Sequence, residues 1–498
     1  MTDLYIDGTW VSPSDGAPDR VVLNPADGSE LARVSEASGT DVEVAVAAAR
    51  RAFDAGPWRA TTARERGELL RRVADLLVRD RAELGRIESL DTGKTLNEGG
   101  IDIDDVTAVF RYYAGIADGH AGRVVDTGDA GVMSRVVYEP VGVCALIAPW
   151  NYPLLQMSWK VAPALAAGNT MVIKPSEVTP MSTIAFVRLL AEAGVPAGVV
   201  NLVLGDGPNV GAAMVSHPGV DMVSFTGGLA TGQRIMAAAA TGVKKIALEL
   251  GGKNPNIVFA DADFDTAVDY ALAAAFVHSG QVCSAGARLI VEDAIHDEFV
   301  AELARRAKAI RLGNGLDPDA ECGPLVSEAH RAKVEGYIAG AIDEGARLVA
   351  GGKRPDEAAL RDGFFLRPTI FADCTRDMTI VREEVFGPVV TVERFRTEAE
   401  AVELGNDTEY GLAGAVWTSD GSVAQRVAGA LRHGTIWIND YHPYLPQAEW
   451  GGFGKSGIGR ELGPTGLDEY REAKHIYHNI NPAPMRWFGH GADEAGVN

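Results

Sequence analysis

The stretch VGVCALIAPWNYPLLQMSWKVAPALAAGNTMVIKPSE, residues 141–177, decides the fold. It begins with an apolar run at 141–150 that predicts a buried strand, and residues 154–167 have the length and composition of a helix. A second apolar run at 169–175 predicts another strand. Strands joined by a helix of this length favour a right-handed crossover, so the stretch predicts an α/β unit with a parallel sheet.

The same alternation continues toward the carboxyl end of the chain. A helix is expected near 182–193, followed by the strand VVNLVLG and a short helix from Pro208. The strand VDMVSFTG and a helix from Leu229 come next. A long helix then runs toward Cys283, and a second alternating unit covers roughly 284–440. The pattern predicts a second set of crossovers.

Three segments stand outside this alternation. Residues 41–90 are rich in Ala, Leu, Glu and Arg at helical spacing. Residues 124–142 alternate like a hairpin and predict an arm or an edge hairpin. The chain is expected to be irregular after about Ile476, and its polar end, GHGADEAGVN, is expected to be frayed.

Charge and composition exclude several classes of partner. The 498 residues include 46 basic and 68 acidic side chains, a net charge of −22, which argues against nucleic acid and anionic membranes. No signal peptide is evident, and apolar runs such as 271–277 are too short to span a bilayer. The cysteines Cys144, Cys283, Cys322 and Cys374 have neither metal nor disulfide spacing. We therefore expect a cytoplasmic protein with free thiols and no metal site.

Cys283, in FVHSGQVCSAG, is the first residue with chemical promise. A free cysteine is most often a small buried apolar residue. Here Gly280, Ser284 and Gly286 flank it and suit a tight turn that presents a side chain. Because a thiolate adds readily to carbonyl carbons, a nucleophile and a core residue are about equally supported by the local sequence.

Glu249, in KKIALELGGKNP, lies at the end of an apolar run. A buried carboxylate needs a partner or a purpose. One interpretation is an ion pair with Lys244, Lys245 or Lys253. The other is a general base whose pKa is raised by burial, beside a backbone that two glycines allow to turn sharply.

Asn151, in APWNYP, follows the first predicted strand directly. Ligands of open α/β sheets bind at the carboxyl ends of the strands. An amide in that place can donate a hydrogen bond to a developing oxyanion. Taken alone, the segment also fits an ordinary turn.

Two glycine-rich segments compete as a phosphate-binding loop. One is GDG at 205–207 with Gly211, whose spacing only approximates a dinucleotide fingerprint. The other is FTGG at 225–228 with Gly232, which opens a helix. Either would offer backbone N–H groups and a helix N-terminus to a pyrophosphate. Glu177 could accept from a ribose hydroxyl, or could simply favour the start of the next helix.

Taken together, these motifs resemble the aldehyde dehydrogenase superfamily from LYIDGTW to about Tyr477. The matching blocks are PWNYPLLQMSWKVAPALAAGN, KPSE, FTGG, LELGGK, GQVCSA, EEVFGPV, NDTEYGLAG and WGGFGKSGIGRELG. The resemblance implies an α/β fold of two doubly wound parallel-sheet domains and a small β oligomerisation arm. The dinucleotide-binding domain would span 1–123 and 143–256, the catalytic domain 257–440, and the arm and tail 124–142 and 470–498.

The resemblance also implies roles for individual residues. Cys283 would be the nucleophile, Glu249 the base, and Asn151 the oxyanion donor with the Cys283 backbone N–H. Lys160 and Glu461 would form a proton relay to solvent. The implied cofactor-binding residues are Trp150, Lys174, Ser176, Glu177, Gly207, Gly211, Gly227, Gly228, Leu250, Glu384 and Phe386. Gly228 departs from the serine usual in the family, which removes a hydroxyl from the phosphate site.

Within the superfamily the chain most resembles betaine aldehyde and amino-aldehyde dehydrogenases. The aromatic residues Tyr152, Trp159 and Trp450 match positions that line the substrate tunnel there, and NDYHPY at 439–444 resembles the bacterial choline-to-glycine-betaine subgroup. Aromatic faces attract a quaternary ammonium group. A position that is often aromatic in plant members is Val277 here. The aromatic cage around the ammonium group would then be left open, or be closed by Tyr441, Tyr444 or Phe453. For any one of these rings, core packing is an alternative.

These features predict oxidation of an aldehyde, most specifically a cationic one such as betaine aldehyde, with NAD favoured over NADP. Glu177 is expected to repel a 2′-phosphate. An ω-aminoaldehyde or simple aliphatic aldehyde is an alternative substrate. A remote alternative is that the chain is a non-catalytic protein on the same scaffold. A homodimer or homotetramer is expected.

Overall fold

The structure, a computed structural model, describes residues 3–14, 19–119, 122–485 and 487–488. Its larger sheet has the strand order β19-β11-β10-β7-β8-β9-β1-β2. Neighbours from β11 to β9 run parallel, and β1 and β19 join antiparallel to them. The strands are β1 (Leu4–Ile6), β2 (Thr9–Val11), β7 (Val143–Ile147), β8 (Thr170–Lys174), β9 (Val200–Leu202), β10 (Met222–Thr226), β11 (Lys245–Glu249) and β19 (Gly457–Ile458).

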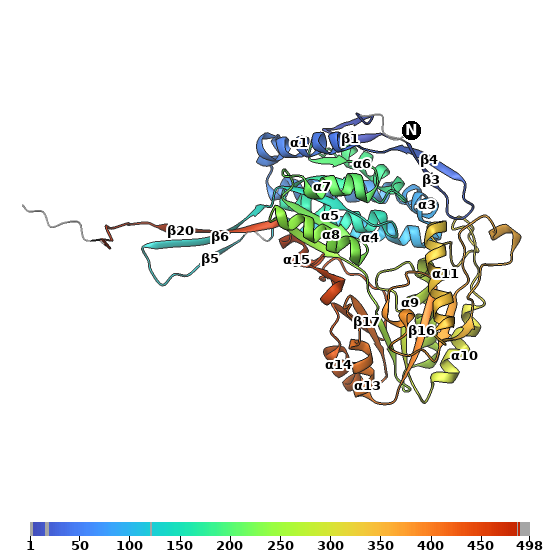
Figure 1. The fold of residues 1–498 in the computed structure, drawn as a ribbon. Helices are drawn as coiled ribbons and strands as arrows, with labels where there is room; N and C mark the ends of the chain where they lie inside the picture. The colour runs from blue at the N-terminus through green and yellow to red at the C-terminus, as the bar shows by residue number, and fades with distance from the viewer. Residues whose placement is uncertain (1–2, 15–18, 120–121, 486, 489–498) are drawn as a thin grey trace, which may run out of the picture.

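Helices cover the larger sheet (Figure 1). The helix expected at 154–167 is α5, which starts at Pro153, where a missing N–H costs nothing, and ends before Gly168 at φ +97°. Every residue of α5 is buried, because α2, α4 and α6 pack around it. The helices are α1 (Gly39–Ala55), α2 (Ala63–Arg79), α3 (Arg81–Thr92), α4 (Leu96–Ile116), α5 (Pro153–Ala167), α6 (Met181–Glu192), α7 (Ala212–Ser216) and α8 (Leu229–Thr241).

A second sheet has the order β14-β15-β16-β13-β12-β17-β18 and is parallel except at β14. Its strands are β12 (Pro255–Val258), β13 (Arg288–Glu292), β14 (Arg347–Ala350), β15 (Thr369–Ala372), β16 (Val389–Phe395), β17 (Ala413–Trp417) and β18 (Thr435–Ile438). Its helices are α9 (Phe264–Phe276), α10 (His296–Ala307), α11 (Glu328–Asp343), α12 (Thr379–Arg382), α13 (Glu398–Asn406) and α14 (Gly421–Ala430). The two largely parallel sheets confirm the predicted α/β class.

A narrow arm extends from the side of the molecule (Figure 1). It consists of β5 (Arg123–Val125), β6 (Val132–Pro140) and β20 (Arg471–Asn479), all antiparallel. The predicted hairpin is thus confirmed. The expectation that the chain turns irregular after about Ile476 is wrong, because β6 gives β20 a partner as far as Asn479. The end expected to be frayed, 489–498, lies outside the described residues.

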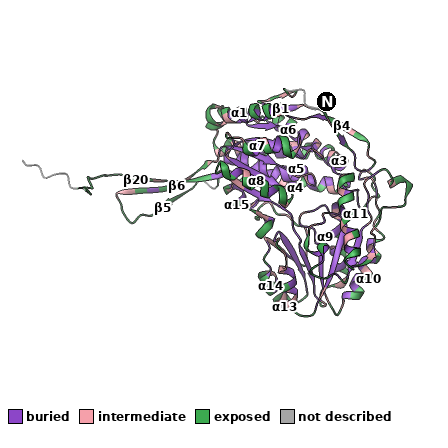
Figure 2. Ribbon diagram, in the orientation of Figure 1, coloured by how far each residue is buried: buried purple, intermediate pink, exposed green. Residues whose placement is uncertain are grey.

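Three smaller elements complete the fold. β3 (Asp19–Leu23) and β4 (Glu30–Ser35) form a hairpin, and α15 (Gly463–Asp468) precedes β20. Figure 2 shows the strands of both sheets as largely buried, with exposed residues along the arm. In the described part of the chain, no helix has the length and apolarity to cross a membrane.

The chain order of the larger sheet defines where a ligand can bind. From β7 the chain moves outward through β8 and β9, then returns to place β10 and β11 on the other side of β7. β7 and β10 are neighbouring strands, and the loops that follow them therefore lead away from each other. A crevice outside the carboxyl ends of the strands is expected at such a reversal.

Candidate active site

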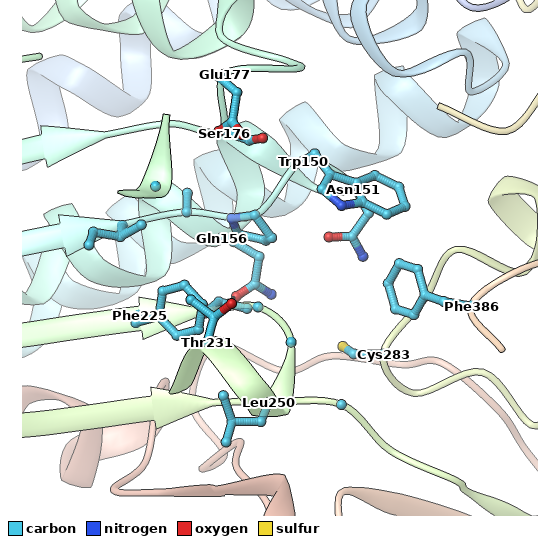
Figure 3. Close-up of a pocket in the computed structure, with 18 of the residues that line it drawn as sticks. Trp150, Asn151, Gln156, Ser176, Glu177, Phe225, Thr231, Leu250, Cys283 and Phe386 are labelled. Atoms are coloured by element: carbon cyan, nitrogen blue, oxygen red, sulfur yellow. Dashed lines mark hydrogen bonds between the residues drawn. The ribbon is translucent and has the colours of Figure 1, made fainter. Parts of the chain in front are cut away.

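A cavity of about 540 Å³, called the groove below, opens at this reversal. Most of its walls come from the segments that follow β7, β8, β9, β10 and β11. The region of the second sheet contributes Cys283, His330, Lys333, Glu384 and Phe386. Figure 3 shows the side chains that converge on it. The expected cofactor residues that line the groove are Trp150, Lys174, Ser176, Glu177, Gly207, Gly227, Gly228, Leu250, Glu384 and Phe386.

Gly211 is the expected cofactor residue that does not line the groove. It ends the short turn Gly207–Gly211 and is buried, with the Lys174 side chain 3.8 Å from the place of a Cβ. Both candidate phosphate-binding segments line the groove. The first contributes Gly207, and the second contributes Gly227 and Gly228. No atom of the described residues lies within 4 Å of a Cβ placed on Gly228, so the missing serine side chain leaves open space.

The N-terminus of α8 fits the phosphate groups of a dinucleotide. Gly228 is the N-cap of this helix, and no side chain in the described part of the chain caps its first N–H groups. Free N–H groups and the helix dipole favour an anion at that point. At the far end of the groove, the Lys174 ammonium lies 3.6 Å from the Glu177 carboxylate. These residues suit the phosphate and ribose parts of a dinucleotide.

Cys283 lies in the turn between α9 and β13. His278 and Ser279, both at positive φ, turn the chain sharply after α9. Asn254 then holds the turn, because its side-chain nitrogen donates to the carbonyl oxygens of Cys283 and Ala285 at 2.9 and 3.0 Å. The Cys283 side chain is the partly exposed thiol of the chain and faces the groove, whereas the other cysteines are buried. The position favours the nucleophile over the core residue.

The charge state of Cys283 depends on its surroundings. Burial raises the pKa of the thiol, and the carboxylates of Glu384 and Glu249 raise it further. The backbone N–H groups of Ser284 and Cys283 oppose this shift in pKa. Forming the thiolate therefore requires a nearby group that takes up the proton.

Asn151 directs its amide toward this turn (Figure 3). Its side-chain nitrogen donates to the Gln281 carbonyl oxygen at 2.8 Å. The amide carries a second N–H, which that bond leaves free. Asn151 thus both holds the turn that contains Cys283 and retains a donor, which favours the predicted oxyanion donor over an ordinary turn residue.

Glu249 is buried at the end of β11 without the partners that a structural ion pair would need. Lys244, Lys245 and Lys253 instead donate to backbone carbonyl oxygens. Its Oε1 has no hydrogen-bond partner among the described residues. Burial raises the pKa of Glu249 strongly, and the charge of Glu461 raises it further. These observations favour the general base.

Lys160 and Glu461 form a buried ion pair next to Glu249, with side chains 0% and 3% exposed. The Lys160 ammonium also donates to the Thr226 hydroxyl at 2.8 Å. Glu461 Oε2 has no hydrogen-bond partner among the described residues. The pair therefore offers a free carboxylate oxygen close to the base.

Two residues of the second region close the groove opposite the larger sheet. Glu384 accepts from the Gly252 N–H at 2.9 Å, and burial raises its pKa to about 7. Phe386, at φ +61°, meets the Trp150 ring edge-on at 5.2 Å. The sequence did not point to His330, whose Nε2 bonds to the Phe386 carbonyl oxygen at 2.7 Å and whose ring lies 5.0 Å from Trp150. His330 supports both aromatic walls.

An aromatic cluster adjoins the turn that contains Cys283. It comprises Trp159, Trp437, Tyr441, Tyr444 and Trp450. The Tyr444 ring lies 5.9 Å from Trp159 and 5.0 Å from Trp450. Its hydroxyl is 2.5 Å from the Ser284 hydroxyl, and Tyr441 donates to the Ser284 carbonyl oxygen at 2.9 Å. The rings of Trp437 and Trp450 are stacked, with their centres 6.1 Å apart. The sequence did not point to Trp437.

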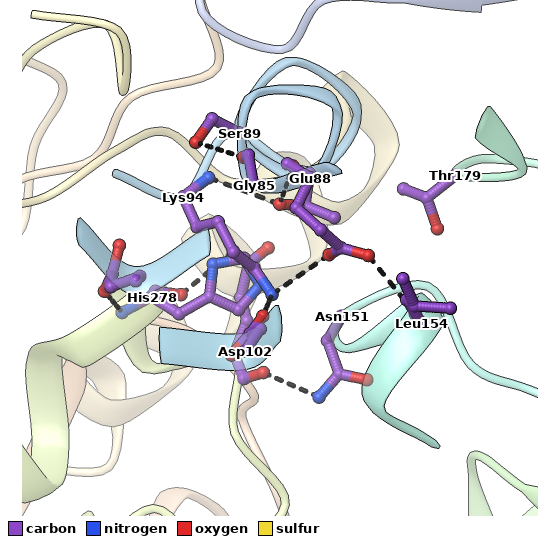
Figure 4. Close-up of polar contacts among 12 residues, drawn as sticks. Gly85, Glu88, Ser89, Lys94, Asp102, Asn151, Leu154, Thr179 and His278 are labelled. Carbon is purple, nitrogen blue, oxygen red and sulfur yellow. Dashed lines mark hydrogen bonds and ion pairs between the residues drawn. The ribbon is translucent and has the colours of Figure 1, made fainter. Parts of the chain in front are cut away.

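The remaining expected cage residues lie differently. Tyr152 has the Lys94 ammonium 4.1 Å from its ring centre, so one face already holds a cation. Lys94 is paired with Glu88 and Asp102 in a buried cluster, which Figure 4 shows next to Asn151. The suggestion that Phe453 closes the cage is wrong. Its ring is 41% exposed and packs under Arg460, beside Gly411.

Comparison with known proteins gives consistent relatives. A model described as "Aldehyde dehydrogenase family" matches residues 10–476. A betaine aldehyde dehydrogenase of Bacillus subtilis (strain 168) is 58% identical over 485 residues, 97% of this chain and 99% of that protein. Aminoaldehyde dehydrogenase 2 of Zea mays is 45% identical over 97% of each chain. A crystal structure of betaine aldehyde dehydrogenase from Staphylococcus aureus in complex with NAD+ superposes with a TM-score of 0.97 at 53% identity, covering 98% of this chain and 97% of that one.

Proposed function

The chain belongs to the aldehyde dehydrogenase family, and we propose that it oxidises betaine aldehyde to glycine betaine with NAD as the cofactor. One observation carries the activity: the Cys283 thiol faces the groove, beside the Asn151 amide. The identity of 58% with a betaine aldehyde dehydrogenase and the aromatic cluster beside Cys283 support the substrate.

NAD, when bound, supplies the acceptor for a hydride. The residues that would hold it are those of the groove: Gly227 and Gly228 at the start of α8 for the phosphates, Lys174 and Glu177 for a ribose, and Glu384 on the nicotinamide side. NAD bound to the S. aureus structure supports this choice.

The covalent steps begin at Cys283. The thiol first loses its proton to solvent in the groove, and the sulfur, as thiolate, then adds to the aldehyde carbon and forms a thiohemiacetal whose oxygen carries the negative charge. The second N–H of the Asn151 amide and the backbone N–H of Cys283 donate to that oxygen. Loss of a hydride from the carbon then leaves a thioester on the sulfur.

Glu249 is the base for hydrolysis. It takes a proton from water while the water oxygen adds to the thioester carbon. The carbon–sulfur bond then breaks, which releases the acid and restores the thiolate. Because burial and the charge of Glu461 raise the pKa of Glu249, its carboxylate is a stronger base than that of an ordinary glutamate. The Lys160–Glu461 pair takes the proton onward.

Aromatic rings and acidic groups near Cys283 support a substrate with a cationic end. Burial raises the pKa of Tyr444, and the charge of Asp105 raises it further, so an acidic group lies close to the cluster. Burial raises the pKa of Asp105 to about 6, with Asp104 adding to the shift. Rings and acidic groups together attract a trimethylammonium group.

Measured kcat/KM values for betaine aldehyde, 4-aminobutyraldehyde, propanal and benzaldehyde, each with NAD and NADP, test the proposal. Betaine aldehyde with NAD is expected to give the highest value. A higher value for 4-aminobutyraldehyde would move the assignment to ω-aminoaldehydes, and an absence of NADH formation with every aldehyde would overturn the activity.

We also propose a homodimer or homotetramer built through the arm, in the cytoplasm. Exposed apolar side chains support the first part: Val124 is 81% exposed and Tyr477 is 61% exposed. Free cysteines support the second part, because oxidising compartments favour disulfides.

A further inference from the structure

Gln156 is a polar groove residue that the steps above do not use. It lies on α5 and is 6% exposed, with its side chain in the groove wall near Cys283. The Thr226 hydroxyl donates to its side-chain oxygen at 3.2 Å. No described residue accepts a hydrogen bond from its side-chain nitrogen. The groove therefore contains a donor that the protein itself does not satisfy.

Lys160 determines which way the Gln156 amide faces. An ammonium group can only donate, and Lys160 donates to the Thr226 oxygen at 2.8 Å. The Thr226 hydroxyl hydrogen then has the Gln156 oxygen as its acceptor. A turned amide would leave this buried hydroxyl hydrogen without an acceptor, at a cost comparable to a lost hydrogen bond. The NH₂ group consequently faces the groove.

The direction of this NH₂ group indicates what it can bind. Figure 3 shows the Gln156 nitrogen turned toward the Cys283 side of the groove. The hydride leaves a carbon bonded to the Cys283 sulfur, so the ring that accepts it must come close to that sulfur. The polar substituent of a nicotinamide ring is its carboxamide, whose oxygen is a good acceptor for an amide N–H.

We propose that Gln156 donates a hydrogen bond to the carboxamide oxygen of the nicotinamide ring and is a positioning residue for hydride transfer. The inference rests on the proposed NAD dependence. Through Thr226 and Lys160, the same hydrogen-bond chain reaches Glu461. The group that holds the nicotinamide ring is thus joined to the pair that takes up protons during hydrolysis.

The substitution Gln156→Met tests the proposal, since it keeps the length of the side chain and removes the amide. Dissociation constants of NAD and ADP-ribose can be measured by quenching of tryptophan fluorescence, because Trp150 lines the groove. NAD binding should weaken about three- to tenfold, the loss of one neutral hydrogen bond, and ADP-ribose binding should not change. Ser158→Ala on the same helix, whose hydroxyl bonds to the Leu155 carbonyl oxygen, should change neither constant.

Equal weakening of NAD and ADP-ribose would overturn the proposal in favour of simple packing, and an unchanged NAD constant would overturn it as well. A second measurement needs no variant. In the natural protein, the thionicotinamide analogue of NAD, with a poor acceptor, should bind more weakly than the 3-acetylpyridine analogue, which keeps the oxygen. Equal binding of these analogues would contradict the proposal. Failure of the natural protein to bind both NAD and ADP-ribose would instead contradict the proposed function.

Discussion

Lys160 and Glu461 are paired in the interior, and the pair lies within electrostatic reach of Glu249. One oxygen of Glu461 accepts from Lys160, while the other has no hydrogen-bond partner among the described residues. Because a free buried carboxylate oxygen is costly, an arrangement of this kind is expected to serve proton movement rather than stability.

Glu461→Gln should therefore slow hydrolysis more than acylation. The amide keeps the shape but removes a proton acceptor next to Glu249, and a loss of about tenfold or more in the steady-state rate is expected. The first turnover should still produce a burst of NADH, measured by stopped-flow absorbance. Equal slowing of burst and steady state would show that the pair acts before the thioester forms.

Glu249→Gln should also keep the burst and lose most of the steady state, because acylation precedes the attack of water. The pH dependence follows from the raised pKa of Glu249, caused first by burial and then by Glu461. Below this pKa the base is protonated, so the natural steady-state rate should rise with pH, and the rise should come at a higher pH than an ordinary glutamate would give. The variant should lack that rise. A pH profile unchanged by the substitution would assign it to another group.

Lys94→Met should strongly destabilise the fold. Lys94 is fully buried between Glu88 and Asp102, and its removal leaves two carboxyl groups without their cation. Breaking a buried ion pair in this way costs about 3–5 kcal/mol. Lys455→Met, which breaks an exposed pair with Glu409, is the matched control and should cost below about 1 kcal/mol. Urea denaturation gives both values, and similar losses would contradict the buried role.

NAD should be preferred over NADP, because Glu177, which we propose binds a ribose, lines the groove 3.6 Å from Lys174. A carboxylate there repels a 2′-phosphate. Glu177→Gln should narrow the ratio of the kcat/KM values for the two cofactors, mainly by improving the value for NADP. An unchanged ratio would mean that Glu177 is turned away from the ribose.

Much of this site was predictable because parallel strands bring distant loops to one edge. The strand after Gly142 and the helix after Tyr152 have clear periodicity, and Asn151 lies between them. The turn that presents Cys283 was also visible in the glycines around it. The expectation of an irregular tail after Ile476 was wrong. Pairing with β6, which is distant in sequence, extends the strand.

Residues that hold other site residues in place could not be predicted from the sequence. Asn254 holds the Cys283 turn across 29 positions of sequence, and His330 reaches Phe386 across 56. Neither has a local pattern, because an amide or imidazole that bonds to a distant carbonyl looks like any polar residue in sequence. The failure of Phe453 to join the aromatic cluster has the same cause, since Arg460 and the loop at Gly411 determine where its ring packs.

Trp450→Ala tests the substrate most directly. Trp450 is 4% exposed and contacts both Trp159 and Tyr444, so its removal opens the aromatic cluster. A cation–π contact of about 1 kcal/mol per ring predicts a loss of roughly fivefold or more in kcat/KM for betaine aldehyde. Propanal carries no cation and should lose much less.

Trp450→Phe is the matched control, because Trp450 also exchanges backbone hydrogen bonds with Glu461 at 2.7 and 2.8 Å. A smaller ring keeps an aromatic face and that backbone contact, so it should retain most of the preference for betaine aldehyde over 3,3-dimethylbutanal, which has the same shape without the charge. If the alanine variant loses equal activity toward betaine aldehyde and propanal, Trp450 shapes the site without recognising charge. The aromatic argument for a cationic substrate would then fail, although the oxidation of aldehydes at Cys283 would stand.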